Sequence, residues 1–202
     1  MAAAALTVSV AGCGHNSTSS TSKSGSASSA TSTGSSAPSS SASGPASSGL
    51  AQPGDYTRLL IQATDIDAPV TFTGGPPINN PNGQPGAAIT FSTDDGSHAI
   101  KDTIQIFADP AAATNALNAA KGQQGNVVKD SMTDSVNVGA GGTALSGKSP
   151  DDSKGVTVLL FTSGRALVTI EFDGPRNSLA PPDFVAGVGQ KQDTAIKNGL
   201  GG

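Results

Sequence analysis

Residues 156–172 read Val-Thr-Val-Leu-Leu-Phe-Thr-Ser-Gly-Arg-Ala-Leu-Val-Thr-Ile-Glu-Phe, and this stretch decides the fold. It holds two apolar runs of strand length, Val156–Phe161 and Ala166–Phe172, rich in β-branched and aromatic residues. The residues between them, Thr162–Arg165, include a glycine and suit a tight turn. The stretch therefore predicts a β-hairpin. Because the first run is apolar on both sides, we expect it to be a central strand.

A second hairpin is predicted upstream, with strands at Ala87–Ser92 and Ile100–Phe107 and a turn at Thr93–Ser97. In its second strand isoleucines alternate with polar residues, which is typical of a sheet with one face in water. Shorter apolar segments predict further strands at Ser135–Val138 and Thr143–Ser146.

Three segments have helical patterns. Asp55–Ile66 reads as a short amphipathic helix, and the Gly/Pro-rich segment after it, 73–86, as a loop. Asp109 followed by Pro110 predicts the start of an alanine-rich helix that runs to Gln124. In the last helix Asp183 is the expected cap and Gly199 the expected end. Strands grouped between helices predict an α+β fold, a twisted antiparallel sheet backed by helices.

The composition excludes several classes of protein. Leu, Ile, Val and Phe make up 19% of the 202 residues, and there are 26 Gly, 13 Pro, no Trp and one Cys. These counts exclude a disulfide-rich scaffold, a Cys-ligated structural zinc and an all-helical bundle. A sequence pI of about 4.9 argues against nucleic acid as the main partner.

The first thirteen residues are uncharged, small and apolar, and they end in the single cysteine. They are too short for a membrane span and read as a secretory signal. Val10-Ala11-Gly12-Cys13 resembles the bacterial lipobox, which implies cleavage between Gly12 and Cys13 and diacylation of the Cys13 thiol. No Lys or Arg precedes Cys13, which predicts a signal peptide truncated at its N-terminus. The alternative is a buried N-terminal helix with a free core cysteine.

A serine-rich tract follows the cysteine. Between Asn16 and Gly49, 17 of 34 residues are Ser and 4 are Thr, and no apolar side chain is larger than alanine. Nothing there offsets the entropy of ordering the chain, so we expect a disordered tether with a reach of roughly 35 Å, open to O-linked sugars. The predicted organisation is a signal peptide at 1–12, a lipidated Cys13 with a linker at 13–53, and a single domain at 54–202.

One string matches a nucleotide-binding pattern. Gly142 to Ser149 reads Gly-Thr-Ala-Leu-Ser-Gly-Lys-Ser, the GxxxxGK[ST] pattern of a phosphate-binding loop. That chemistry needs a helix beginning at the lysine, and only Pro150–Gly155 separate the string from the next strand. Asp151 and Asp152 would also repel phosphate. We therefore expect a hairpin loop here, with no nucleotide and no other cofactor.

The remaining candidates for chemistry are isolated. His98 has Ser92, Ser97 and Asp95 near it in sequence, as a hydrolase triad would need, but a histidine at the end of a hairpin is more often a solvated turn residue. Acidic side chains could pair as hydrolase carboxylates or ligate calcium. Asp65, Asp67, Asp151 and Asp152 are better explained as turn and cap residues. Glu171 is better explained as a residue on the water-facing side of a strand. We expect no metal site and assign no catalytic residue.

With the lipobox, the Ser/Thr tether and the acidic domain in place, the chain resembles mycobacterial-type (actinobacterial) secreted lipoproteins. The order of its elements is similar to that of the LpqN-like lipoproteins. The segment Leu59-Leu60-Ile61-x-x-x-Asp65-Ile66 is similar to the start of the extracellular sensor domain of the serine/threonine kinase PknH. These resemblances imply an α+β domain on the extracytoplasmic face of the cell membrane, and they transfer no catalytic residue.

Two hypotheses for function follow. The first is a non-enzymatic envelope lipoprotein, anchored in the membrane through Cys13, whose domain binds a protein or a cell-wall or lipid ligand. In that case the Ala/Gly-rich helix is expected to leave an apolar groove against the sheet. The second is a secreted hydrolase that uses His98 or a pair of carboxylates.

Overall fold

The computed structural model describes residues 54–201. The predicted signal peptide at 1–12, the cleavage between Gly12 and Cys13, the lipidation of Cys13 and the tether up to residue 53 all lie outside the described residues.

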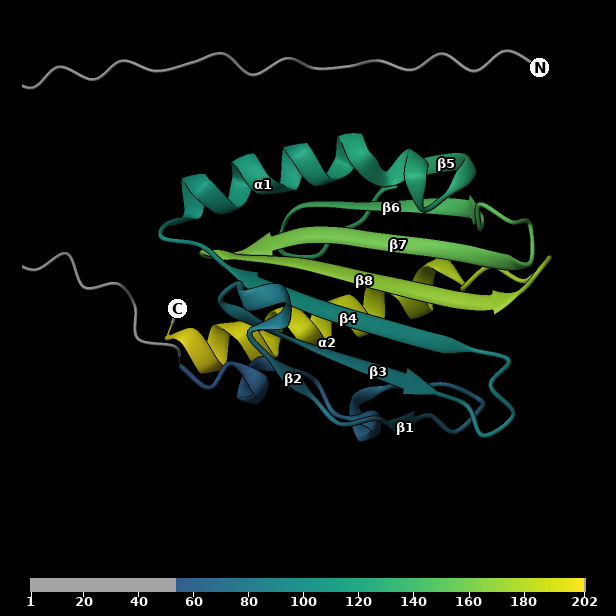
Figure 1. Ribbon diagram of the computed structural model, residues 1–202, viewed down its shortest axis with the longest axis horizontal. Helices are drawn as coiled ribbons and strands as arrows, with labels where there is room; N and C mark the ends of the chain where they lie inside the picture. The colour runs from purple at the N-terminus through teal and green to yellow at the C-terminus, as the bar shows by residue number, and fades with distance from the viewer. Residues whose placement is uncertain (1–53, 202) are drawn as a thin grey trace, which may run out of the picture. The chain divides into compact units, whose positions relative to one another are not determined.

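The described strands form one antiparallel sheet, shown in Figure 1, in the order β1-β3-β4-β8-β7-β6-β5, with β2 also paired to β3. The strands are β1 (Thr73–Gly74), β2 (Ile78–Asn79), β3 (Gly86–Ser92), β4 (Ala99–Ile106), β5 (Lys129–Ser135), β6 (Ala140–Lys148), β7 (Lys154–Ser163) and β8 (Ala166–Pro175). The helices are α1 (Pro110–Gln123) and α2 (Pro182–Leu200), with single 3-10 turns at Thr57–Leu59, Ala63–Asp65, Pro81–Gly83 and Gln124–Asn126. The α+β prediction is confirmed.

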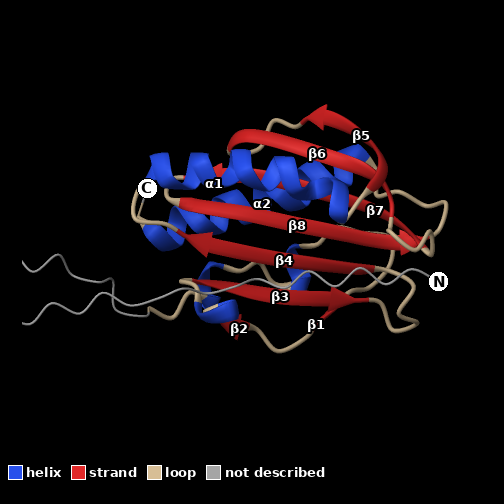
Figure 2. Cartoon of the chain, turned by 45° about the horizontal axis from the view of Figure 1, so that its top comes forward, coloured by secondary structure: helices blue, strands red, loops and turns tan. Residues whose placement is uncertain are grey.

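The two helices cover opposite faces of the sheet, as Figure 2 shows. Leu117 of α1 packs with the β7 side chains Val158 and Leu160 in one apolar cluster. Val188 of α2 packs with Leu159 of the same strand in the other, larger cluster. Strand β7 therefore alternates between two cores, which is why its sequence is apolar on both sides. It lies between β8 and β6, so the predicted central hairpin is confirmed.

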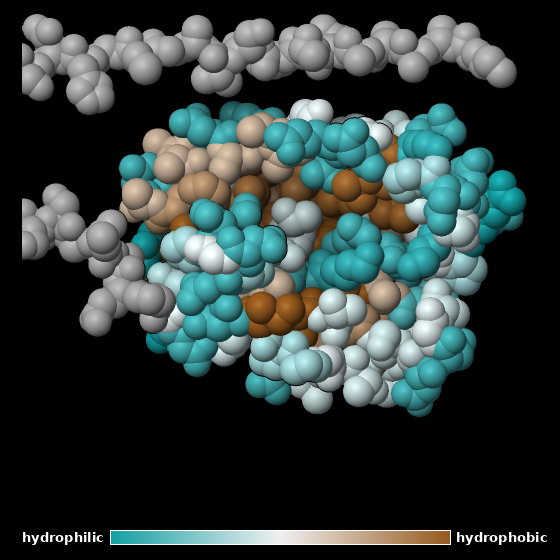
Figure 3. Space-filling view, viewed as in Figure 1, coloured by the Kyte–Doolittle hydropathy of each residue, from teal (hydrophilic) through white to brown (hydrophobic). Residues whose placement is uncertain are grey.

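The second predicted hairpin is also confirmed. Strand β3 pairs antiparallel with β4 over seven residue pairs, from Gly86↔Gln105 to Ser92↔Ala99. Helix α1 covers only part of one sheet face. The β3–β4 part of that face is in water, and Thr90 and Lys101 are exposed there. In Figure 3 apolar residues gather along and beside α1, and hydrophilic residues lie over the middle of the sheet.

The predicted helix at Asp55–Ile66 is wrong. The segment forms two 3-10 turns joined by extended backbone, with Leu60 at φ −76° and ψ 144°. The buried side chain of Gln192 on α2 accepts from the Ile61 N–H at 3.0 Å and donates to the Leu59 carbonyl at 2.7 Å. These backbone groups are thus satisfied by a distant side chain, so the segment can bury its apolar residues on the sheet without helical bonds.

The strand predicted at Ser135–Val138 is displaced. The strand is Lys129–Ser135, and residues 136–139 make the turn into β6. Every residue of β5 is exposed, so its sequence has no period-2 apolar pattern to predict it. The apolar signal came from Val138, which is buried in the turn. Within the loop predicted at 73–86, two short strands and a 3-10 turn form.

The helix ends are partly as predicted. Asp109 caps α1, since its carboxylate accepts from the Ala112 N–H at 2.8 Å. Asp183 is not the cap of α2, because the helix begins one residue earlier behind Pro181 and Asp183 lies in its first turn. The helix continues past Gly199 to Leu200, and Gly201 takes the left-handed conformation that ends it, with φ 68°.

Candidate functional site

A cavity of about 260 Å³ opens where the start of β4, the end of β8 and the first turn of α2 meet two loops, 67–72 and 178–181. Its largest apolar lining residues are Val70, Phe72, Ile100, Phe172, Leu179 and Phe184. The sheet supplies the floor, because Ile100 and Phe172 are paired across β4 and β8 and face α2. The alanine-rich helix α1, for which the sequence predicts a groove, lines neither this cavity nor a second one described below.

Aromatic rings wall the cavity. Three of the six phenylalanines line it: Phe72, Phe172 and Phe184. The rings of Phe172 and Phe184 pack edge to face, with centroids 5.7 Å apart and an interplanar angle of 69°. Edge-to-face pairs are stabilised by the ring quadrupoles, so the wall between β8 and α2 is held in one arrangement.

The mouth of the cavity is apolar as well. Val70 and Leu179, from the two loops, keep 45% and 40% of their surface exposed. Among the described residues only Ile78 and Met132 are large hydrophobic side chains with similar exposure, and neither lines the cavity. Exposed aliphatic side chains beside an apolar hollow are typical of a ligand site.

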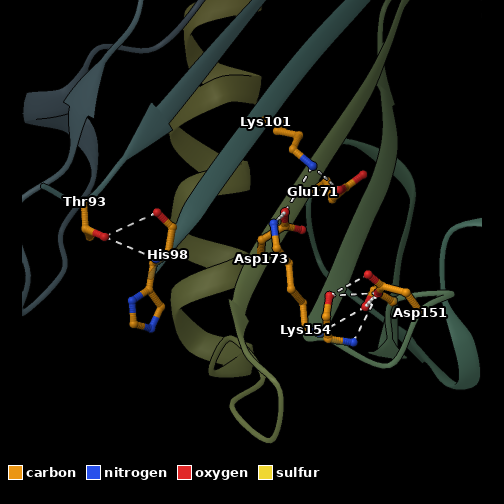
Figure 4. Close-up of polar contacts among 9 residues, drawn as sticks. Thr93, His98, Lys101, Asp151, Lys154, Glu171 and Asp173 are labelled. Carbon is orange, nitrogen blue, oxygen red and sulfur yellow. Dashed lines mark hydrogen bonds and ion pairs between the residues drawn. The ribbon is translucent and has the colours of Figure 1, made fainter. Parts of the chain in front are cut away.

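His98 lies at the cavity, immediately before β4. Its backbone N–H donates to the Thr93 hydroxyl at 3.2 Å, as seen in Figure 4. Its ring nitrogen Nδ1 is 2.9 Å from the Ser97 hydroxyl, which is itself 2.9 Å from Oδ1 of Asp95. Thr93 also donates to Asp95, at 2.6 Å, and this bond, with those from the Ser97 backbone and hydroxyl, lowers the pKa of Asp95 to about 2.

The predicted neighbours of His98 are therefore partly brought together. Ser97 and Asp95 join it in one hydrogen-bonded chain, and no bond joins Ser92 to it. In a hydrolase triad the histidine lies between the nucleophile and the acid. Here the serine lies between the acid and the histidine, so its hydroxyl is committed to Asp95 rather than activated.

Glu171 and Asp173 of β8 form a charged group with two lysines on the sheet face away from α2 and the cavity (Figure 4). Oδ2 of Asp173 accepts from Lys101 at 3.1 Å and from Lys154 at 3.0 Å, and Lys101 also meets Glu171 at 2.6 Å. Burial acts to raise the pKa of Asp173, but the bonds from Lys154 and Lys101 outweigh it and hold the pKa below its ordinary value. Glu171 thus pairs with a lysine on the face away from α2, not with a second carboxyl across a cleft.

The other predicted acidic candidates do not gather into a site. Asp65 lies in a 3-10 turn and Asp67 at the cavity wall, while Asp151 accepts from Ser149 and Ser153 in the β6–β7 turn. Those bonds hold the pKa of Asp151 well below its usual range. Within residues 54–201, no three His, Cys, Asp or Glu side chains are grouped closely enough to hold a metal ion.

A second cavity, of about 460 Å³, lies on the other side of Ala180 and is more polar. Its walls come from the β5–β6 turn, the α2-facing side of β6 and β7, and the first turn of α2. There Ser146 and Thr157, paired across the strands, exchange a hydrogen bond at 3.1 Å. The hydroxyls are thus engaged with each other.

Most of the string from Gly142 to Ser149 lies in strand β6, which confirms the strand predicted at Thr143–Ser146 and not the predicted hairpin loop. Residues up to Lys148 belong to β6, and Ser149 opens the turn into β7, so no helix begins at the lysine. Its glycines have a different explanation. A Cβ on Gly142 would overlap the Val136 carbonyl oxygen, and one on Gly147 would overlap the Lys129 carbonyl oxygen. Both glycines let the backbone around β5 pass close to β6.

We expect Gly147→Ala to lower the free energy of unfolding by about 2 kcal/mol, because the new methyl group meets backbone rather than a movable side chain. Lys148→Ala is the matched control, and we expect a change within about 0.5 kcal/mol. Urea unfolding followed by circular dichroism measures both. Equal stability of Gly147→Ala and the unaltered chain would contradict this account of the string.

The cavity could not be found from the sequence, because its lining comes from segments far apart in the chain. The one local signal was a pair of valine and leucine residues, Val70 and Leu179, within Pro-rich loops, where apolar side chains have no strand or helix to bury them. Among the described helices none is long and apolar enough to cross a membrane.

No protein-family model matches the chain, and no curated protein matches its sequence. Among solved structures, the crystal structure of the extracellular domain of PknH from Mycobacterium tuberculosis is similar, with a TM-score of 0.54 and 11% sequence identity. The match covers 73% of this chain and 98% of that domain. At this identity the likeness concerns the fold, and the predicted resemblance to the PknH sensor domain is confirmed at that level: this chain shares the fold of the PknH extracellular domain.

Proposed function

We propose that this chain is a cell-envelope lipoprotein, held on the extracytoplasmic face of the membrane by acyl chains on Cys13. Its domain binds a small, mainly apolar ligand of the envelope and does not catalyse a reaction. The lipobox, the serine-rich tract and a fold shared with an extracellular domain support the location.

The cavity with its aromatic wall and aliphatic mouth is the observation that carries the binding function. A volume of about 260 Å³ is close to the lower end of small-molecule sites. This volume exceeds that of a dry cavity of about 150 Å³, engineered into another protein, that binds benzene. The space therefore suits a short chain or one ring system rather than a whole membrane lipid.

The alternative is a secreted hydrolase that uses His98 or a pair of carboxylates. The position of His98 at the cavity favours it, whereas the bond from Ser97 to Asp95 and the lysine partners of Glu171 and Asp173 do not. Hydrolysis of a nitrophenyl butyrate ester that is lost in His98→Ala would establish this alternative.

Binding can be tested with Prodan, a neutral, polarity-sensitive naphthalene dye that has no hydrogen-bond donor. The full chain with Cys13→Ser is used, so that no acyl chain of the protein competes. We expect dye binding with a blue-shifted emission, and an affinity about tenfold lower in Leu179→Glu, since a carboxylate at the mouth must be desolvated by the dye.

Ile78→Glu is the matched control, because Ile78 is also exposed, at 56%, and lines neither cavity. We expect it to leave the affinity for Prodan unchanged. No binding, or equal weakening by the two substitutions, would count against the cavity as the ligand site.

A further inference from the structure

The hydrogen bonds around His98 decide which of its ring nitrogens carries the proton. Asp95 is a carboxylate and can only accept, so the Ser97 hydroxyl proton points to it in a charge-assisted bond. The Ser97 oxygen then accepts from Nδ1 of His98, which must hold the ring proton in the neutral imidazole. The other ring nitrogen, Nε2, keeps its lone pair.

Nε2 is thus an acceptor beside an apolar cavity. Among the described residues no side-chain or backbone group donates to it, and His98 belongs to the lining. A donor on a bound molecule could complete its hydrogen bonding. An acceptor on that molecule would instead face a lone pair.

The charged side chains around the cavity also favour an uncharged ligand over an anion. Among the described residues the lining includes no lysine or arginine, and its acidic side chain is Asp67, because the carboxylate of Asp173 lies with its lysines on the sheet face away from α2. The two lysines nearest to Asp173 are already engaged by its carboxylate. The N-terminus of α2 meets the cavity at Phe184, and Asp183 in its first turn offsets that positive pole. Within residues 54–201, no side chain of the lining offers an anionic ligand a free lysine or arginine as counter-charge.

We propose that the cavity selects an uncharged apolar molecule that carries one hydrogen-bond donor, such as an alcohol, and that Nε2 of His98 accepts this donor. Ser97 is a positioning residue that fixes the tautomer. This inference rests on the proposed binding function and names the chemical class of its ligand. An apolar carboxylate or a molecule with acceptors only should bind less well.

The test compares three eight-carbon competitors for bound Prodan on the full chain with Cys13→Ser: octanol, heptyl methyl ether and octanoate. We expect octanol to displace the dye at a concentration about tenfold lower than the other two, the effect of one buried hydrogen bond made or lost. In His98→Phe, which keeps a ring but no acceptor, the ratio of octanol to ether should fall to about one. Ser92→Ala, a nearby exposed serine without a bond to His98, is the matched control and should keep the preference.

Nitrogen NMR of the imidazole provides a second readout that a purely structural role would not move. The Nδ1–H tautomer should dominate in the unaltered ring and lose its dominance in Ser97→Ala. If Prodan binds but octanol is no better than the ether, or octanoate is best, the donor inference is overturned and the binding function stands. If Prodan does not bind at all, the proposed function itself fails.

Discussion

Replacing Asp102 with valine should raise the free energy of unfolding at pH 7 by about 3 kcal/mol, which would lift the melting temperature by roughly 10 °C. Asp102 lies in β4 on the side that faces α2, between Ile89 and Ile170 in the register of the sheet. It is 0% exposed, and neither carboxyl oxygen has a hydrogen-bond partner among the described residues. Burial alone raises its pKa to about 8.

The sign of the pH dependence follows from that pKa. Between about pH 4, the ordinary value for an aspartate, and about pH 8, folded Asp102 holds a proton that the unfolded chain has released. Each pH unit in this window therefore lowers the free energy of unfolding by about 1.4 kcal/mol. This loss in the free energy of unfolding is absent below about pH 4 and reaches its full size above about pH 8. At pH 7 it amounts to about 4 kcal/mol, and the larger valine side chain returns about 1 kcal/mol of it as strain.

Urea unfolding of both proteins at several pH values between 4 and 8 isolates this group. The difference in free energy between Asp102→Val and the unaltered chain should grow steadily across that range. Asp134→Val is the control, because Asp134 is an exposed aspartate on another strand and should give a flat difference. A flat difference for Asp102→Val would show that its carboxyl is paired or hydrated in solution.

Cys13→Ser should move the protein out of the membrane. Each lipid CH₂ buried in the bilayer contributes about 0.8 kcal/mol, so the two or more acyl chains on a lipobox cysteine hold a protein firmly, whereas no chain gives no anchor. Expressed in its own host, the unaltered protein should sediment with membranes. The serine variant should be found in the soluble envelope fraction or the medium.

The matched control is Ser17→Ala, a substitution in the same segment that leaves the lipobox intact. It should remain with the membranes. Intact mass of the unaltered, membrane-extracted protein gives the same information directly, because an unmodified Cys13 there would contradict the lipoprotein assignment.

The central sheet could be predicted because its signals are local. Val156–Phe161 and Ala166–Phe172 are strand-forming on their own, and the turn between them is short. The segment Asp55–Ile66 could not, since Gln192, far away in the chain, replaces the helical hydrogen bonds that its sequence favours. Strand β5 gave no apolar pattern, because it is an exposed edge strand that pairs with β6.

The candidate site was harder to predict, because its geometry depends on contacts between segments that are far apart in the chain. His98, Ser97 and Asp95 are neighbours in sequence, so their meeting could be foreseen, but their order in the hydrogen-bonded chain could not. The burial of Asp102 is indicated by the sequence. It lies two residues from both Ile100 and Ile104 on the same strand, so its side chain must point to the same side, toward the core. The cavity depends on loops that join only in three dimensions.

Native mass spectrometry of the chain purified from its own host tests the central claim, that the domain binds a small apolar ligand in the cavity at β4, β8 and α2. The account predicts one small molecule bound to each chain, of uncharged apolar character, and its loss in Leu179→Glu but not in Ile78→Glu. Protein that is free of any bound molecule in several independent preparations, or a molecule retained equally by both variants, would contradict it.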